Sequence, residues 1–78
     1  MNKELRKQIA TEISVAGITL ENTAAILKKH GATYVITTSY EISARGVVYR
    51  KSDGKELSKP PMIRVVAELK QAITEDMK

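Results

Sequence analysis

The segment that most constrains the fold is residues 33–57, the only part of the chain whose composition is typical of β-sheet. β-Branched and aromatic side chains dominate it, and it contains every aromatic residue of the protein, all of them tyrosines. Turn-forming residues interrupt it at Ser43–Gly46 and at Ser52–Gly54. The pattern predicts a first strand over 33–43, a second over 47–50, and a short edge strand over 55–57.

Counting by twos along the predicted first strand separates its side chains into two faces. We expect the face toward the helices to hold Tyr34, Ile36, Thr38, Tyr40 and Ile42. The opposite face, which we expect to contact solvent or a partner, holds Thr33, Val35, Thr37, Ser39, Glu41 and Ser43. We also expect Glu41 to pair across the sheet with Arg50 or Lys51.

Two helices are predicted before the sheet. Asn2 is a suitable N-cap for the first helix, because its side chain can accept from the free amides of the first turn. Gly17 ends that helix at about Val15, Thr19 caps the second helix, and Gly31 ends it. Apolar residues recur at helical spacing along both segments, at Leu5, Ile9, Ile13 and Ala16 in the first and at Leu20, Ala24 and Leu27 in the second.

A third helix is predicted after the sheet. Pro60 and Pro61 mark its start, where missing amide hydrogens cost nothing, and Glu75 and Asp76 are expected in a frayed C-terminal tail. The element order predicts a single α+β domain over residues 1–78, with two N-terminal helices, a three-stranded antiparallel sheet and a C-terminal helix (ααβββα). The predicted shared core consists of Leu5, Ile9, Ile13, Leu20, Leu27, Ile36, Ile42, Val66, Leu69 and Ile73.

Composition limits how such a chain is stabilised and where it acts. The chain has 78 residues, no Cys, no Phe and no Trp, so its core is thin and no disulfide or thiolate metal site can supplement it. A homodimer is therefore possible, since pairing would bury more apolar surface. No apolar run approaches the length that spans a bilayer, and the polar N-terminal helix does not resemble a signal peptide, so we expect no membrane partner and a cytoplasmic location.

The basic charge is concentrated around the second and third predicted strands. Residues 45–64 contain six cations but only two carboxylates, Asp53 and Glu56, so this segment accounts for the whole formal net charge of +4. A two-stranded ribbon that carries cations can follow phosphates or enter a groove, and a tyrosine beside them can stack on a base. The predicted binding residues are Arg45, Tyr49, Arg50, Lys51, Lys55, Lys59 and Arg64.

These residues support two hypotheses and one plain structural interpretation. The first hypothesis is a small nucleic-acid-binding regulatory protein, more specifically a DNA-binding one, that uses the basic β-hairpin. The alternative is a small inhibitor or adaptor of the phage or mobile-element type that binds an acidic surface of a host protein or nucleoprotein complex. The structural interpretation is that the charges protect an edge strand from unwanted pairing.

The residues that catalysis or metal binding would require are missing. His30 is the only histidine, and its place beside Gly31 at a helix end is typical of a cap. No His, Asp or Glu spacing fits a metal site, and no glycine-rich phosphate loop is present. We therefore expect no enzymatic activity, no cofactor and no metal.

Parts of the chain resemble three kinds of nucleic-acid-binding protein. Gly17, Ile18 and Ile26 match a helix-turn-helix, but Ile13 and Thr23 depart from it, which favours a plain helical hairpin. The two helices, the hairpin and the last helix with Ala67-Glu-Leu-Lys-Gln-Ala resemble HU/IHF nucleoid proteins, but the Gly-x-Gly-x-Phe turn and the proline-tipped basic arm are absent. The helix–three strands–helix order resembles the double-stranded-RNA-binding domain, but the lysine cluster at the start of the final helix is absent. No residue is assigned by these resemblances.

Overall fold

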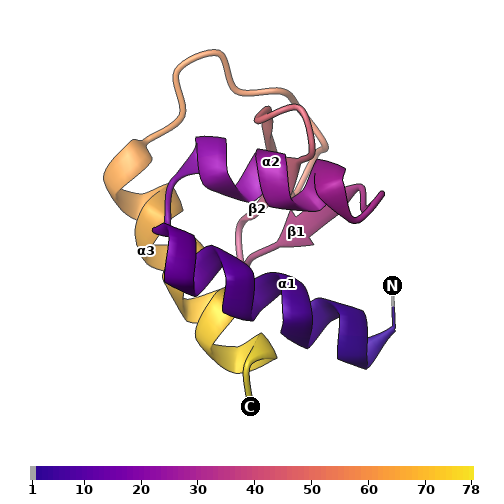
Figure 1. Cartoon of the computed structure of the whole chain (residues 1–78). Helices are drawn as coiled ribbons and strands as arrows, with labels where there is room; N and C mark the ends of the chain where they lie inside the picture. Colours follow the sequence, from indigo (N-terminus) through magenta and orange to yellow (C-terminus); the bar gives the residue numbers. More distant parts are fainter. Residues whose placement is uncertain (1) are drawn as a thin grey trace.

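The computed structural model describes residues 2–78 as an α+β fold in which helices pack against one face of a small sheet (Figure 1). The sheet is antiparallel with strand order β1-β2-β3, which confirms the predicted fold class. The elements are α1 (Lys3–Ala16), α2 (Leu20–Lys29), β1 (Tyr34–Ile36), β2 (Tyr40–Ser43), β3 (Val48–Arg50) and α3 (Met62–Asp76).

The helix boundaries follow the predicted caps. Asn2 Oδ1 accepts from the backbone N–H of Leu5 at 2.7 Å, and Thr19 Oγ1 accepts from that of Asn22 at 3.0 Å, so each side chain satisfies an amide that the helix leaves free. Gly17 ends α1 at a φ of 117°, a conformation that side-chain-bearing residues rarely adopt. At the other end of the chain, α3 continues as regular helix through Asp76, so the predicted frayed tail is wrong.

The predicted first strand is two strands joined by a tight turn. The chain reverses at Thr37–Ser39, where the Thr37 N–H donates to the Tyr40 carbonyl at 2.8 Å and the Thr37 hydroxyl accepts from the Tyr40 N–H at 3.0 Å. The Thr37 hydroxyl substitutes here for the turn-forming glycine or asparagine that usually reveals a hairpin. The three strands of the sheet are therefore β1, β2 and β3 rather than the three segments predicted.

This turn inverts the faces predicted for β1. In the register of the two strands, Val35 lies opposite Ile42 and Ile36 lies opposite Glu41. Residues that lie opposite one another in an antiparallel pair point to the same face of the sheet. Val35 therefore joins Ile42 on the helix side, whereas Ile36 is 56% exposed on the outer face, so its predicted place in the core is wrong. Tyr34 is likewise exposed rather than packed on the helices.

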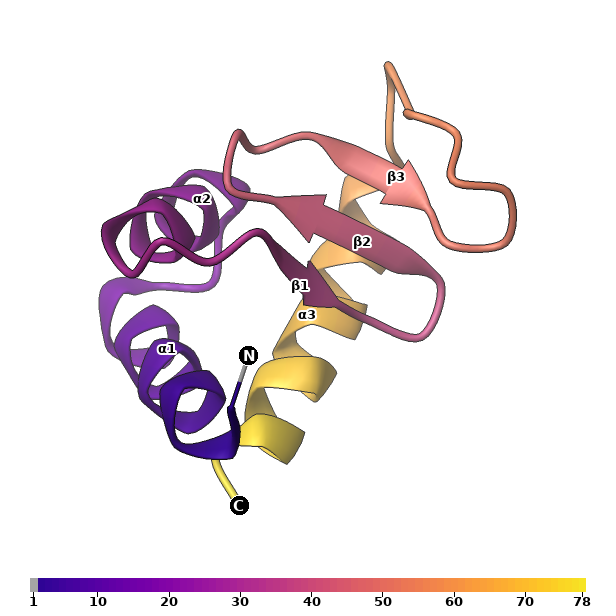
Figure 2. The same cartoon turned by 90° about the vertical axis from the view of Figure 1, so that its right-hand side faces the viewer.

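The other side of β3 is covered by the segment that was predicted as an edge strand. The Arg50 N–H donates to the Lys55 carbonyl at 2.8 Å, and the Leu57 N–H donates to the Val48 carbonyl at 2.9 Å. A single isolated bridge, Tyr49 to Glu56, replaces the predicted strand. Figure 2 shows this loop folding back beside β3, whereas β1 forms the opposite edge of the sheet and has no such cover from residues 2–78.

The core lies between the inner face of the sheet and the helices. Its buried members include most of the predicted set, while Leu5 and Leu20 pack at its margin and Val66 is half-buried. No helix among residues 2–78 is long and apolar enough to cross a membrane. The buried apolar residues are Ile9, Ala10, Ile13, Leu27, Tyr40, Ile42, Val48, Val65, Leu69 and Ile73.

Candidate nucleic-acid interface

The predicted binding residues separate into three groups in the folded chain. Arg50, Lys51 and Arg64 line one concavity at the end of the sheet. Arg45 and Tyr49 meet on the outer face of the sheet. The remaining two, Lys55 and Lys59, are exposed in the loop between β3 and α3 and line neither site.

The first group forms what we call the cationic concavity, a hollow of about 400 Å³ lined by residues from three segments. The turn between β1 and β2 forms one wall, the end of β3 forms another, and the first turn of α3 supplies Arg64. The Lys51 N–H donates to the Ser39 carbonyl at 2.9 Å, which holds the two sheet-side walls together. The full lining is Thr38, Ser39, Tyr40, Arg50, Lys51, Ser52 and Arg64.

Both arginines of the concavity have an acidic neighbour that positions them without burying them. Arg50 Nε lies 3.5 Å from Asp53, and Arg64 Nε lies 3.4 Å from Glu68. The arginine side chains are 46% and 67% exposed, so these ion pairs are weak and solvent-screened. A phosphate can therefore compete for both guanidinium groups, which present several donors each, and the neighbouring hydroxyls add further donors.

The second group, Arg45 and Tyr49, lies beside Tyr34 on the outer face, where Tyr34 and Tyr49 form what we call the tyrosine pair. The two rings meet edge to face, with centroids 6.4 Å apart and planes at 78°. Arg45, in the turn between β2 and β3, donates from Nη2 to the Tyr49 hydroxyl at 2.9 Å. Glu41 lies opposite Tyr49 in the register, and no ion pair joins it to Arg50 or Lys51 in the described chain, so the predicted cross-strand pairing is wrong.

Ser43 explains why Arg45 is held over this face. Ser43 Oγ accepts from the backbone N–H groups of both Arg45 and Val47 at 3.2 Å, and Gly46 completes the turn at a φ of 78°. The turn predicted over Ser43–Gly46 is confirmed. The second predicted turn is also confirmed, since Asp53 Oδ1 accepts from the Lys55 N–H at 3.0 Å and Gly54 has a φ of 70°.

His30 has a structural position. It caps α2, and its Nε2 lies 2.7 Å from Glu12 Oε2 on α1. Lys29 Nζ contacts the other oxygen of Glu12 at 2.8 Å, and these hydrogen bonds, that from Lys29 first, hold the pKa of Glu12 below its ordinary value. Within residues 2–78, no group of three or more His, Cys, Asp or Glu side chains is arranged to hold a metal ion.

Tyr34, Thr38 and Ser39 belong to these sites and were not predicted as binding residues. The turn at Thr37–Ser39 hides them, because it contains no Gly, Pro, Asn or Asp and its threonines are β-branched residues typical of a strand. Recognising that turn would have shifted the face of β1 by one residue and placed Tyr34 beside Tyr49. Comparison with protein-family models, curated proteins and solved structures finds no match for this chain.

Proposed function

We propose that this protein is a small, non-enzymatic nucleic-acid-binding regulator that acts in the cytoplasm, with DNA as the expected target. The observation that carries the proposal is that Arg64, from the first turn of α3, lines the same concavity as the consecutive residues Arg50 and Lys51 at the end of β3. Phosphate contacts supply most of the affinity of sequence-independent nucleic-acid binding, and arginine suits them because it presents a planar set of donors.

The outer face supports the same proposal. Tyr34 and Tyr49 offer aromatic surface, and Arg45 lies beside it. Stacking on aromatic side chains is how many proteins hold unpaired bases, while cations follow the backbone. The cationic concavity would bind phosphates, and the tyrosine pair would contact a base where the strand is open.

A gel-retardation assay with neutralised variants tests the proposal. The test variant carries Arg50→Gln, Lys51→Gln and Arg64→Gln, and the control carries Lys3→Gln, Lys7→Gln and Lys28→Gln, at exposed positions on α1 and α2. Both variants lose the same formal charge, so a general electrostatic effect would weaken their binding to DNA equally. We expect the test variant to lose binding to duplex DNA and the control to retain it; equal binding by the two variants would contradict the proposal.

A further inference from the structure

The free edge of β1 exposes backbone groups that no other described segment pairs with. The Ala44 N–H donates to the Thr33 carbonyl at 3.0 Å, and the Thr37 N–H donates to the Tyr40 carbonyl at 2.8 Å, so Thr33 and Thr37 face β2. Because backbone groups alternate along a strand, those of Tyr34 and Ile36 point away from β2. Their N–H and C=O groups therefore remain available for pairing with another strand.

Apart from its length of only three residues, this edge carries none of the devices that usually prevent strand addition. Lysine, proline, a bulge or a covering loop commonly protect an exposed edge. The opposite edge is covered by the loop that bonds to Val48 and Arg50, whereas β1 has the sequence Tyr34-Val-Ile36 and no cover among residues 2–78. The asymmetry between the two edges marks β1 as the edge open to a partner.

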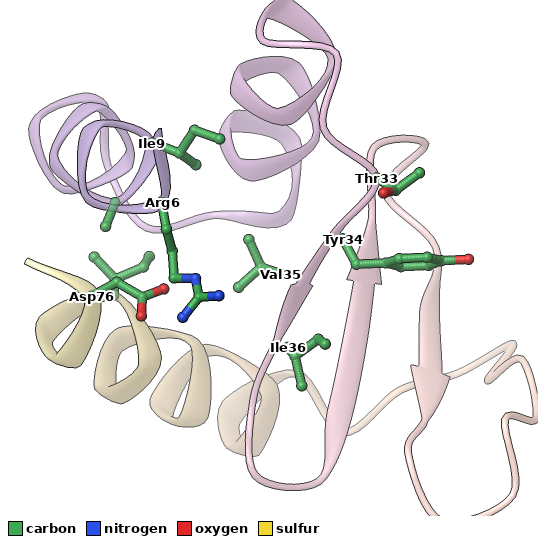
Figure 3. Close-up of a pocket in the computed structure, with 9 residues that line it drawn as sticks. Arg6, Ile9, Thr33, Tyr34, Val35, Ile36 and Asp76 are labelled. Atoms are coloured by element: carbon green, nitrogen blue, oxygen red, sulfur yellow. The ribbon is translucent and has the colours of Figure 1, made fainter. Parts of the chain in front are cut away.

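A groove runs beside the open edge. One hollow of about 340 Å³ lies between β1, α1 and α3, with an apolar wall formed by Ile9, Ala10, Val35 and Ile73. Figure 3 shows Val35 and Arg6 projecting into this space and Tyr34 pointing away from it. An added strand would place every second side chain toward this hollow, so an apolar residue fits there.

The groove becomes acidic in the direction of the turn between β1 and β2. A second hollow, also about 340 Å³, shares Ile36 and Asp76 with the first and adds the carboxylates of Glu68 and Glu75 from α3. Its lining also includes one cation, Lys51, so three carboxylates face a single lysine. Glu75 contacts Lys78, but Asp76 forms no ion pair with any described residue. Burial raises the pKa of Asp76, although the charge of Arg6 acts in the opposite direction. A cation placed here would favour the ionised carboxylate.

We propose that the β1 edge and this groove bind an extended peptide segment of another protein by strand addition. Facing the groove, the segment carries an apolar side chain and a basic side chain two residues apart. The first enters the hollow beside Val35, and the second reaches Asp76. Neighbouring positions on one face of a strand are about 7 Å apart, so two such side chains can enter two hollows that adjoin at Ile36 and Asp76.

A second copy of this chain fits the groove less well. Its β1 segment, residues 33–37, contains no basic residue to face Asp76. The α1 and α3 helices of the second copy would accompany its β1 strand. They would collide with α1 and α3 of the first copy, which already line the groove. The site therefore has room for one added strand. Its acidic end adjoins the cationic concavity at Thr38 and Lys51, but the carboxylates that line it distinguish it in charge.

Selection from a displayed library of random peptides about eight residues long tests the proposal directly. We expect enrichment of peptides in which an apolar residue and a Lys or Arg lie two positions apart, in the order set by the direction of the added strand. Amide chemical-shift changes with a selected peptide should concentrate in residues 33–37, Arg6–Ala10 and Ile73–Asp76. The proposal would be overturned if acidic peptides were enriched and their binding were lost when Arg50, Lys51 and Arg64 are replaced by Gln. The peptide site would then be the cationic concavity.

Two variants test the two contacts separately. Ile36→Pro removes an N–H that points away from β2, and Asp76→Lys reverses the charge where the basic side chain of the peptide binds. Each variant should bind the selected peptide about tenfold more weakly, or weaker still. Glu21→Lys on α2 makes the same charge change away from the groove and should leave affinity unchanged. If Ile36→Pro fails to fold, Asp76→Lys alone decides the question. Undiminished binding by a folded variant, or a wild-type dimer that Ile36→Pro dissociates, would overturn the proposal.

Discussion

The carboxylate of Glu68 on α3 accepts a hydrogen bond from the backbone N–H of Ser39 at 2.7 Å. The same oxygen accepts from the Thr37 hydroxyl at 3.0 Å, while the other oxygen contacts Arg64. Glu68 thus fixes the turn between β1 and β2 from 29 residues away in the sequence, and it orients one cation of the concavity. A single side chain couples the fold of the hairpin to the geometry of the site.

Replacing Glu68 with alanine should destabilise the protein by about 1–3 kcal/mol, because the Ser39 N–H and the Thr37 hydroxyl lose a charged acceptor. Chemical denaturation measures the change. Glu75→Ala is the matched control, because it also removes a glutamate from α3, and the ion pair of Glu75 with Lys78 is exposed. This variant should lose no more than about 0.5 kcal/mol of stability. Equal losses in the two variants would show that Glu68 does not hold the turn.

Stability should fall in acid partly through Glu68. Partial burial alone raises the pKa of this carboxyl, but the hydrogen bonds from Ser39 and Thr37 and the contact with Arg64 favour the ionised form and hold its pKa below the ordinary value. A lowered pKa contributes stability that is fully present above the unfolded value, about 4.3, and is lost as pH falls through the folded value. Wild type and Glu68→Gln should therefore converge in stability between pH 7 and pH 3; a constant difference would contradict this assignment.

The last helix should contribute to stability through one face only. Leu69 is fully buried, so Leu69→Ala should destabilise by about 2–5 kcal/mol, whereas Ile63→Ala, on the exposed side of α3, should change the free energy of unfolding by less than about 0.5 kcal/mol. Thermal and urea unfolding of both variants provide the measurement. A loss below about 0.5 kcal/mol for Leu69→Ala would mean that α3 does not pack as described.

Helix positions were predictable because their signals are local. Asn2, Thr19 and Gly17 act within a few residues of their own positions, and the spacing of apolar residues on α1 and α3 identifies the buried face without knowledge of the rest of the chain. The sheet was less predictable. The turn at Thr37–Ser39 depends on Glu68, a tertiary partner that no local pattern contains.

The candidate site was predictable in composition but not in arrangement. The cluster of cations over residues 45–64 is visible in the sequence. The meeting of Arg50 with Arg64 requires the loop after β3 to return the chain to the end of the sheet.

The homodimer stays a prediction from small size, and sedimentation at micromolar concentration would show it as a mass that rises with concentration.

The tyrosine pair should matter more for unpaired than for paired bases. Tyr34→Leu keeps an apolar side chain on the outer face but removes the ring, so it should weaken binding to a single-stranded oligonucleotide by about 1–3 kcal/mol and affect duplex binding less. The protein has no tryptophan, so quenching of tyrosine emission reports such stacking directly. Equal weakening for both nucleic acids would remove the stacking role.

The salt dependence of duplex DNA binding tests the proposed function most directly. Each phosphate contact releases about one counterion, so the slope of log affinity against log salt should be steep for wild type. It should become shallower by about one unit for each contacting cation removed from the set Arg50, Lys51 and Arg64. The control variant at Lys3, Lys7 and Lys28 should keep the wild-type slope. No retardation of DNA or RNA by the wild-type protein at low salt, or the same slope in all three proteins, would contradict nucleic-acid binding through the cationic concavity.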